Sequence, residues 1–310
     1  MMSTPTPSFD QLQVLLAVVE AGSFSAAARR LNRAQSAVTY AVQRLEEQLG
    51  TTLFDRTSYR PVLTDAGRAL LPRMQMIADE LRALGDHAQG IAAGLEPELT
   101  LVVDAMFPMC PLLDALRAFG TRYPSVPPRL YVETLGGATE LVLNGTAAVG
   151  LLLSFASDFE PLQRQPLLEF TLIPVAAPSH ALGQIEGPLA RDALREHVQL
   201  VLTDRSGLTG SRDYGVLSSQ TWRLADLGAK HAMLTAGFGW GCMPAHLVAD
   251  DLAAGRLRRL MLAADASDAV GATLPLCVAY RRDRPPGPAG RWLLEHLGQM
   301  IETDPTAASA

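Results

Sequence analysis

Apolar residues between positions 35 and 49 recur at intervals of four, three and four, the spacing that places side chains along one face of a helix. The opposite face of this predicted helix is polar, and its side chains are of the kind that reach base edges and phosphates. A solvated face on an ordinary helix is the alternative interpretation. The apolar positions are Val38, Val42, Leu45 and Leu49, and the polar positions are Ser36, Thr39, Tyr40, Gln43 and Arg44, with Gln35 at the edge in the first turn.

The neighbouring segments favour the DNA-binding interpretation. A helix that Ser8 can cap and Gly22 can end is followed by a short alanine-rich helix over residues 25–31, and a tight turn at Asn32 leads into the polar-faced helix. A hairpin-like segment after it carries Arg56 and Arg60. Helix, turn, helix and hairpin together form the pattern of a winged helix-turn-helix, which places one helix in the major groove of DNA. The module is expected to span residues 1–64.

The longest helical pattern begins at Asp65, where Thr64 can cap the first turn. From Leu70 onward its apolar positions repeat as the a and d positions of a heptad, the pattern of a two-helix coiled coil. Residues 65–94 are therefore predicted to form a linker helix whose apolar seam, within residues 65–91, pairs with the same helix of a second copy. Packing against the chain's own C-terminal part is the alternative, and Pro72 should bend the helix near its start. The apolar seam consists of Ala66, Leu70, Met74, Ile77, Leu81, Leu84, Ala88 and Ile91.

Strands and helices alternate through residues 95–302, which predicts an α/β sheet covered by helices on both sides. Residues 303–310 are expected to form a disordered tail. The predicted strands span residues 99–103, 129–134, 148–153, 171–176, 199–202 and 276–280. The predicted helices span residues 111–123, 138–143, 230–236 and 290–302, and residues 237–241 are predicted to form a glycine-rich turn.

Charge changes the picture of the DNA-binding module. The chain of 310 residues has a net charge of −6, but residues 1–66 hold six arginines and six acidic residues and are neutral. Between Arg29 and Arg60, six bases stand against three acids, a locally positive stretch that suits phosphate contacts within a Debye length of about 8–10 Å. A neutral module predicts modest affinity per protomer, so two or more modules should bind DNA together.

Other features of the sequence narrow the function classes. No run of about 18 apolar residues and no basic-apolar leader occurs, so we expect no membrane span and a cytoplasmic location. Three widely spaced cysteines (Cys110, Cys242 and Cys277) show no metal-ligand spacing and no disulfide framework. GxSxG, phosphate-loop and paired-histidine motifs are missing, so an enzyme is the disfavoured alternative, and we expect no catalytic site, metal or cofactor.

Over nearly its full length, the chain resembles the LysR-type transcriptional regulators. The resemblance implies a winged helix-turn-helix, a dimerising linker helix and a two-lobed effector domain that is like a periplasmic binding protein, with a small-molecule cleft between its α/β lobes. It also implies dimers or tetramers on interrupted inverted repeats in double-stranded promoter DNA, with RNA polymerase as a further partner. The motifs are AGSFSAAARRLN, QSAVTYAVQRLEEQLGTTLFDR and LTDAG, then FGTRYPSVPPRLYV, LNGTAAVGLLLS, LIPVAAPSHAL and TAGFGWGCMPAHLVADDLAAGRL.

One departure from the family pattern lies at the start of the recognition helix. Members often carry Ser or Thr at its cap, where this chain has Ala34. Losing a cap costs about 0.5–2 kcal/mol, so the helix start is expected to fray or to be set by Asn32. By position, Gln35, Ser36, Thr39, Tyr40 and Gln43 would face the groove, with Arg33 and Arg44 as further DNA contacts, and Arg56 and Arg60 on the wing would meet phosphate or the minor groove.

Ligands of two-lobed α/β domains bind outside the carboxyl ends of strands, near helix N-termini. That rule selects four segments here: residues 106–108, 135–137, 154–155 and 204–206. Their aromatic and apolar content suggests an effector with an aromatic or apolar part, and their polar groups could hold a carboxylate. Ordinary loop residues are the alternative interpretation. Lys230 could donate to an anion, although a surface lysine is the favoured interpretation. Cys110, at a helix start, offers the alternative of a redox-sensing regulator, because one branch of the family senses peroxide through cysteines. The predicted effector residues are Met106, Phe107, Pro108, Leu135, Gly136, Ser154, Phe155, Asp204, Arg205, Ser206, Lys230, Phe238 and Trp240.

Overall fold

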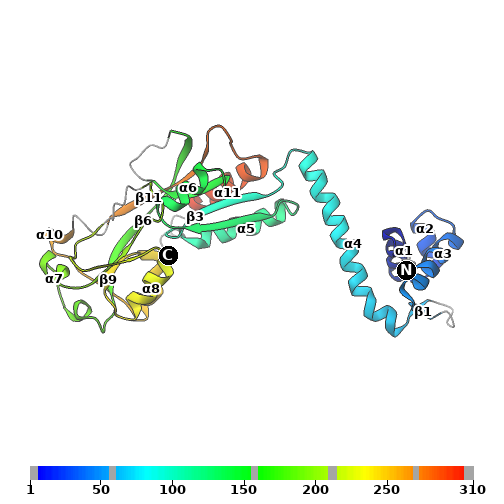
Figure 1. Cartoon of the computed structure of the whole chain (residues 1–310), viewed down its shortest axis with the longest axis horizontal. Coiled ribbons are helices and arrows are strands. Elements are labelled where there is room, and N and C mark those ends of the chain that lie inside the picture. The colour runs from blue at the N-terminus through cyan, green and yellow to red at the C-terminus, as the bar shows by residue number, and fades with distance from the viewer. Residues whose placement is uncertain (1–5, 56–60, 155–159, 209–214, 268–271, 304–310) are drawn as a thin grey trace, which may run out of the picture. The chain divides into compact units, whose positions relative to one another are not determined.

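A computed structural model describes residues 6–55, 61–154, 160–208, 215–267 and 272–303. The chain divides into two units, Met1–Gln89 and Gly90–Ala310 (Figure 1). The first unit contains three helices, an antiparallel strand pair and most of a long fourth helix. These elements are α1 (Phe9–Ala21), α2 (Phe24–Arg30), α3 (Gln35–Leu49), β1 (Phe54–Asp55), β2 (Val62–Leu63) and α4 (Asp65–Ala92).

Local sequence signals set the helix boundaries of the first unit. Ser8 forms a capping box with Gln11 at the start of α1, and Gly22 ends that helix with a φ of 68°. Ser23 Oγ accepts a hydrogen bond from the Ala26 N–H at 3.1 Å, and Thr64 Oγ1 accepts one from the Gly67 N–H at 3.0 Å. The caps predicted at Ser8 and Thr64 are therefore confirmed, and Ser23 caps α2 in the same way.

The core of the first unit lies between α1, α2 and α3. Val38, Val42 and Leu45 are completely buried and pack with the apolar faces of the other two helices, as their spacing predicts. Leu49, predicted to join this apolar face, is 36% exposed because it lies in the last turn, where α3 runs past the core.

The predicted seam of α4 has two parts. Met74 is buried and packs with the core of the first unit, and Ala78 on the next turn is also buried. Further along, the seam residues are exposed on this single chain, and Pro72 lies within the continuous helix. The exposed seam residues are Ile77 (52%), Leu81 (42%), Leu84 (61%) and Ile91 (45%).

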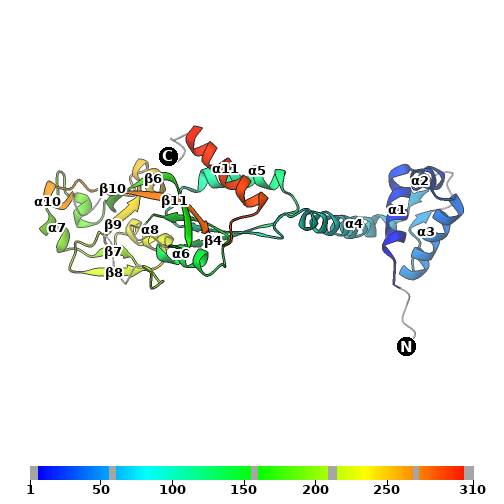
Figure 2. The ribbon, with the colours of Figure 1, turned by 90° about the horizontal axis from the view of Figure 1, so that it is seen from above.

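The described strands of the second unit join in the order β4–β3–β5–β11–β6–β9–β7–β8, and β10 pairs with β6. At one end β3 runs parallel to β4 and β5, and at the other end β7 runs parallel to β8 and β9 (Figure 2). The long antiparallel strands β6 and β11 join these two α/β lobes. The strands are β3 (Leu99–Asp104), β4 (Pro128–Glu133), β5 (Val149–Leu153), β6 (Leu162–Ala176), β7 (Gln199–Leu202), β8 (Thr221–Leu224), β9 (Trp240–Pro244), β10 (Arg258–Arg259) and β11 (Thr273–Arg281).

Helices pack against this sheet around a large apolar core that draws residues from both lobes. Glu96 fixes the last helix, because its carboxylate accepts hydrogen bonds from the N–H groups of Ala289 and Gly290 at 3.1 and 2.9 Å. Among the described residues, no single helix is both long and apolar enough to cross a membrane. The helices of the second unit are α5 (Met109–Arg122), α6 (Gly136–Leu143), the 3₁₀ helix η1 (Ala181–Gln184), α7 (Arg191–Arg195), α8 (Leu227–Thr235), α9 (Ala245–Ala253), α10 (Ala264–Ser267) and α11 (Pro288–Thr303).

The glycine-rich turn predicted over residues 237–241 is wrong in its second half, which forms strand β9. A Cβ atom on Gly239 would lie 2.5 Å from the Val198 carbonyl oxygen, and one on Gly241 would lie 2.7 Å from that of Leu200. These glycines therefore allow β9 to approach the chain at β7 closely, which is a tertiary reason for glycine that turn statistics do not capture.

Candidate functional site

The polar face of α3 is accessible from outside the first unit. Gln35, Ser36, Thr39, Tyr40 and Gln43 line one hollow on its surface, and the Tyr40 side chain is 63% exposed. The Thr39 hydroxyl donates to the Gln35 carbonyl oxygen at 2.9 Å, one turn back along the same helix. The structure thus brings together the five residues predicted to face the groove, and their contact with bases stays a prediction.

Two features hold α3 in place besides its apolar face. Asn32 adopts a φ of 52°, a left-handed conformation that closes the turn from α2. Near the other end, the buried carboxylate of Glu46 accepts hydrogen bonds from the N–H groups of Leu53 and Phe54 at 2.7 and 3.1 Å. Glu46 therefore ties the end of the recognition helix to the first strand of the wing, a role that the sequence pattern did not single out.

Two of the four arginines predicted to contact DNA, Arg33 and Arg44, form ion pairs with acidic neighbours. Arg33 donates to both carboxylate oxygens of Asp10, at 2.8 and 2.6 Å. Arg44 donates to Glu47 at 2.7 Å, one turn further along α3. The two wing arginines, Arg56 and Arg60, lie outside the described residues.

Segments of the two lobes meet at the carboxyl ends of the parallel strands, at a place that we call the interlobe junction (Asp104, residues 133–136 and residues 204–206). A Cβ atom on Gly136 would lie 2.2 Å from Ser206 Oγ and 2.3 Å from Asp204 Oδ2, so the start of α6 touches the loop after β7 directly. Across the same contact, Arg205 donates to Glu133 at 3.0 Å. The junction therefore joins segments that are about 70 residues apart in the chain.

Asp104 lies at the centre of the interlobe junction and is completely buried. Its two oxygens accept hydrogen bonds from the N–H groups of Met106 and Leu135, each at 2.8 Å. Burial raises the pKa of Asp104 to about 7, the two N–H groups oppose that shift, and the negative charge of Asp204 adds to it. Asp204 in turn accepts hydrogen bonds from the Ser206 N–H at 2.8 Å and from its hydroxyl at 2.7 Å.

Three of the four segments predicted to hold an effector meet at or beside this junction. Met106 reaches it through its backbone, while its side chain and that of Phe107 are buried in the core, and Pro108 is also buried. Leu135 is buried as well and has a φ of 55°, a strained conformation for a residue with a side chain. The fourth segment is described only at Ser154, whose N–H bonds to the Pro275 carbonyl oxygen, because Phe155 lies outside the described residues.

Two aromatic residues expected to line the cleft do not reach the interlobe junction. Trp240 is completely buried in β9, where its indole N–H donates to the Leu194 carbonyl oxygen at 3.2 Å. Phe238 is 53% exposed and lies against Trp222, with ring centroids 5.9 Å apart. Since β7, β8 and β9 run parallel, both aromatic rings belong to the amino ends of these strands, away from the carboxyl ends where the lobes meet.

The interpretation of Lys230 as a surface lysine is wrong. Its side chain is 5% exposed, and its ammonium donates to the Cys242 carbonyl oxygen at 2.7 Å. Burial lowers the pKa of Lys230 to about 8, and the nearby Cys242 acts in the opposite direction. The partner is a backbone oxygen, which no pattern of side chains in the sequence reveals. A role for Lys230 toward an effector stays a prediction.

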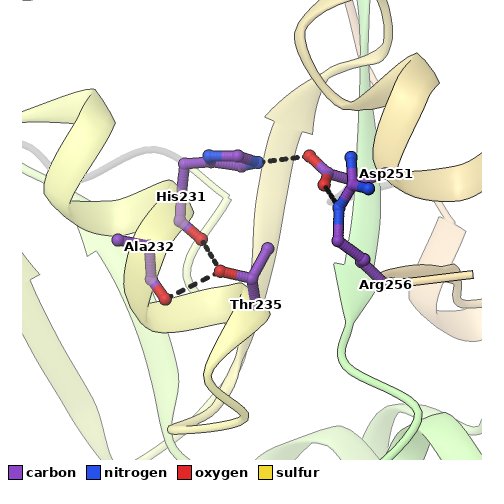
Figure 3. A network of polar contacts seen from close by, with 5 residues as sticks. All are labelled: His231, Ala232, Thr235, Asp251 and Arg256. Atoms are coloured by element: carbon purple, nitrogen blue, oxygen red, sulfur yellow. Dashed lines mark hydrogen bonds and ion pairs between the residues drawn. The ribbon is translucent and has the colours of Figure 1, made fainter. Parts of the chain in front are cut away.

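His231, the next residue in α8, connects that helix to α9. Figure 3 shows the His231 ring directed at the carboxylate of Asp251 in α9, with Nε2 and Oδ2 2.6 Å apart, while Arg256 bonds the other oxygen. Burial alone would raise the pKa of Asp251, but hydrogen bonds from Arg256 and His231 outweigh it and hold the pKa below its usual range. The two attachments fix α8 between β9 and α9.

The three cysteines, all within the described residues, form no disulfide. Cys110 is exposed at the start of α5, and Cys277 is buried, which raises the pKa of its thiol. The alternative of a redox sensor acting through Cys110 stays a prediction.

Two acidic residues of the interlobe junction were missed in the sequence. Asp104 and Glu133 are the last residues of the parallel strands β3 and β4, after the runs LTLVV and RLYV. The sequence did contain a signal for them: each is a charged residue directly after an apolar run. The carboxyl ends of parallel strands meet at one edge of a sheet, so such residues are expected to lie close together. The predicted effector residues lie instead in the loops that follow these strands.

Family models match both parts of the chain. Residues 9–68 match the bacterial regulatory helix-turn-helix protein of the lysR family, and residues 92–302 match the LysR substrate binding domain. A DNA-binding module followed by a ligand-binding α/β domain defines a class of transcriptional regulators. This chain belongs to the LysR family, and it is a DNA-binding transcriptional regulator with an effector-binding domain.

Individual proteins agree with this assignment. The probable HTH-type transcriptional regulator YhaJ of Escherichia coli K12 is 30% identical over 305 residues, which covers 95% of this chain and 97% of YhaJ. A mutant of Corynebacterium glutamicum OxyR has a similar structure, with a TM-score of 0.51 and 21% identity over 98% of this chain and 96% of OxyR. A full-length BenM mutant also has a similar structure, with a TM-score of 0.51 and 19% identity over 96% of this chain and 97% of BenM. These structural likenesses show the fold.

Proposed function

We propose that this regulator binds interrupted inverted repeats in promoter DNA through the polar face of α3. The observation that carries the proposal is the division of this helix: Val38, Val42 and Leu45 are completely buried, whereas Gln35, Ser36 and Tyr40 are exposed on the other side. A helix fixed by one face and free on the other can enter the major groove without rearrangement. The domains proposed are 1–64 for DNA binding, 65–94 for the linker and 95–302 for effector binding.

Pairing of two copies through the apolar seam of α4 is part of the same proposal. The exposed seam residues between Ile77 and Ile91 form an apolar stripe along α4. A second α4 would cover this stripe, and tetramers could form from such dimers. The regulator would act in the cytoplasm, where promoter DNA and RNA polymerase are its partners.

The effector is proposed to bind at the interlobe junction. Arg205 is a cation that an effector carboxylate could engage in place of Glu133, and the buried apolar residue Leu135 belongs to the same junction. Glu133 and Asp204 place negative charge at the same junction, which disfavours a multiply charged anion. We therefore propose a small monocarboxylate with an apolar or aromatic part. Binding there would change how the two lobes meet.

Gel shift and footprinting of the full chain on its own upstream intergenic DNA test the proposed function, with salt varied. Protection of an inverted repeat with half-sites a whole number of helical turns apart is the expected result. Absence of a protected repeat at low salt, across the genome's upstream regions, would contradict it.

Single substitutions should distinguish base contacts from phosphate contacts within the DNA-binding module. Gln35→Ala and Ser36→Ala should change the preferred sequence, because both side chains lie in the first turn of α3. Arg56→Ala should weaken binding to all duplexes similarly and flatten the salt dependence, as expected for a phosphate contact. Equal and uniform losses from all three substitutions, measured on a panel of duplexes, would refute this division.

A further inference from the structure

The recognition helix begins without the side-chain cap that starts the other helices of its module. Ser8, Ser23 and Thr64 each accept a hydrogen bond from a backbone N–H in the first turn of α1, α2 and α4. The residue at the same place before α3 is Ala34, which has no side-chain acceptor. Since a cap contributes about 0.5–2 kcal/mol, something else must hold this helix start if its first turn is to read bases.

The neighbouring residue supplies a different connection. Arg33 Nη1 lies 2.8 Å from Asp10 Oδ2, and Nη2 lies 2.6 Å from Oδ1, so the guanidinium and the carboxylate meet face on through two parallel hydrogen bonds. Such bidentate pairs fix orientation as well as distance. Within the described part of the first unit, Arg33 is the arginine that bonds both oxygens of one carboxylate, and its partner is 23 residues away in the chain.

Asp10 is itself held in a defined place. It lies in the first turn of α1, and the capping box between Ser8 and Gln11 encloses that turn. A carboxylate at this end of a helix also interacts favourably with the helix dipole. The hydrogen bonds from Arg33 hold the pKa of Asp10 below its usual range, so the carboxylate is charged at neutral pH. The turn before α3 is thus attached to the best-capped helix start of the module.

We propose that Arg33 and Asp10 are positioning residues for sequence-specific DNA binding: their bidentate pair replaces the missing cap and holds the first turn of α3, with Gln35 and Ser36, in register. Asp10 contacts no DNA in this arrangement, because an anion would be repelled by phosphate. Arg33, in turn, is occupied by Asp10 and does not serve as a phosphate contact.

Fluorescence anisotropy on the full chain tests the proposal with two labelled duplexes. One duplex carries the consensus obtained by in vitro selection with the unmodified chain, and the other is a scrambled sequence of the same length. The informative variants are Asp10→Asn, which removes the charge with little change of shape, and Arg33→Lys, which keeps a charge but cannot form the bidentate pair. Far-UV circular dichroism establishes that each variant is folded.

Both variants should bind the consensus duplex about five- to twentyfold more weakly and the scrambled duplex within about twofold of the unmodified chain. The slope of log K against log salt should not change, because no phosphate contact is lost. Repeating the selection with Asp10→Asn should yield a more degenerate consensus at the bases read by the first turn of α3.

Three results would overturn the proposal. Tighter binding of both duplexes by Asp10→Asn, with a salt slope steeper by about 1, would mean that Asp10 merely competes with phosphate for Arg33. Retention of full specificity by Arg33→Lys would mean that a point charge is sufficient. Unchanged binding by both variants would mean that the pair has no role in recognition.

The matched control is Glu20→Gln. Glu20 lies in the same helix as Asp10 and pairs with Arg30 through one contact of 2.6 Å, away from the start of α3. This variant should bind both duplexes within about twofold of the unmodified chain. An effect of Glu20→Gln as large as that of Asp10→Asn would assign the loss to general weakening of α1 and would contradict the specific role of the pair.

Discussion

At the scale of single residues, Asp104 links the interlobe junction to pH. Its folded-state pKa of about 7 lies above the ordinary value of 3.8, because burial and Asp204 disfavour its charge. The folded state therefore binds a proton between these two values, where the unfolded state does not. The resulting contribution to stability is fully present below about pH 4 and is lost as the pH rises through 7.

Asp104→Asn should remove this dependence. The free energy of unfolding of the unmodified second unit should fall by up to about 4 kcal/mol more than that of the variant as the pH rises from 4 to 8. Urea titrations followed by tryptophan fluorescence at several pH values measure this, because Trp222, Trp240 and Trp292 all belong to the second unit. Parallel pH profiles for the two proteins would contradict the assignment to Asp104.

Gly136 offers a second test at this scale, since it has no room for a methyl group. Gly136→Ala places a Cβ atom 2.2 Å from Ser206 Oγ and 2.3 Å from Asp204 Oδ2, so the loops must separate. We expect a loss of about 1–3 kcal/mol in the same fluorescence-detected unfolding. The control is Gly120→Ala in α5, where no atom lies within 4 Å and helix propensity should raise stability by about 0.5–1 kcal/mol.

The residues that sequence analysis placed correctly and those it misplaced differ in the range of their interactions. Ser8, Ser23 and Thr64 cap helices through neighbours three residues away, so the local sequence is sufficient. Lys230 was misjudged because its partner, the carbonyl oxygen of Cys242, comes from another element. The buried position of Trp240 depends likewise on a distant partner, the carbonyl oxygen of Leu194. The sequence around these residues contains no pattern that predicts such a distant partner.

At the scale of elements, the same distinction separates helices from strands. The 3.6-residue period was sufficient for α3 and α4, whose boundaries follow the prediction closely. Strand β6 was predicted only over residues 171–176, although it begins at Leu162. Its first half contains polar residues and Pro166, and it is ordered by pairing with β11, whose register irregularity lies between Leu276 and Cys277. Pairing across such a sequence distance is not visible in a local pattern.

The linker helix gives the prediction that belongs to this scale. Leu84→Glu introduces a charge on the exposed apolar seam, and in a paired coiled coil each copy would bury one such charge. The dissociation constant of the dimer should rise by roughly a hundredfold or more, as measured by analytical ultracentrifugation. Gln89→Glu, an exposed position of α4 outside the seam, is the control and should leave the dimer unchanged. A chain that is monomeric before substitution would instead favour packing of the seam against its own C-terminal part.

At the scale of the whole molecule, the neutral charge of the DNA-binding module leads us to expect that tight binding requires two modules. Residues 1–66 carry equal numbers of arginines and acidic residues, and three of their four described arginines, Arg30, Arg33 and Arg44, each have an acidic partner. One module therefore gains little from long-range attraction to DNA. We therefore expect affinity to come from two modules that engage two half-sites at once.

Scrambling one half-site of the protected repeat should reduce affinity at least about a hundredfold, since the second module then loses the benefit of being held near its target. Anisotropy titrations with the intact and the half-scrambled duplexes, at equal length and salt, measure this ratio. A reduction of only a few fold would indicate that single protomers recognise DNA independently.

The burial of Lys230 has a practical consequence for work on this protein. It is the only lysine of the chain, and its ammonium is enclosed between α8 and β9. Amine-reactive dyes should therefore label the folded protein almost entirely at the α-amino group, giving one fluorophore per protomer. Amine-directed cross-linkers would, for the same reason, under-report self-association, whereas reagents that couple carboxylates have abundant exposed targets.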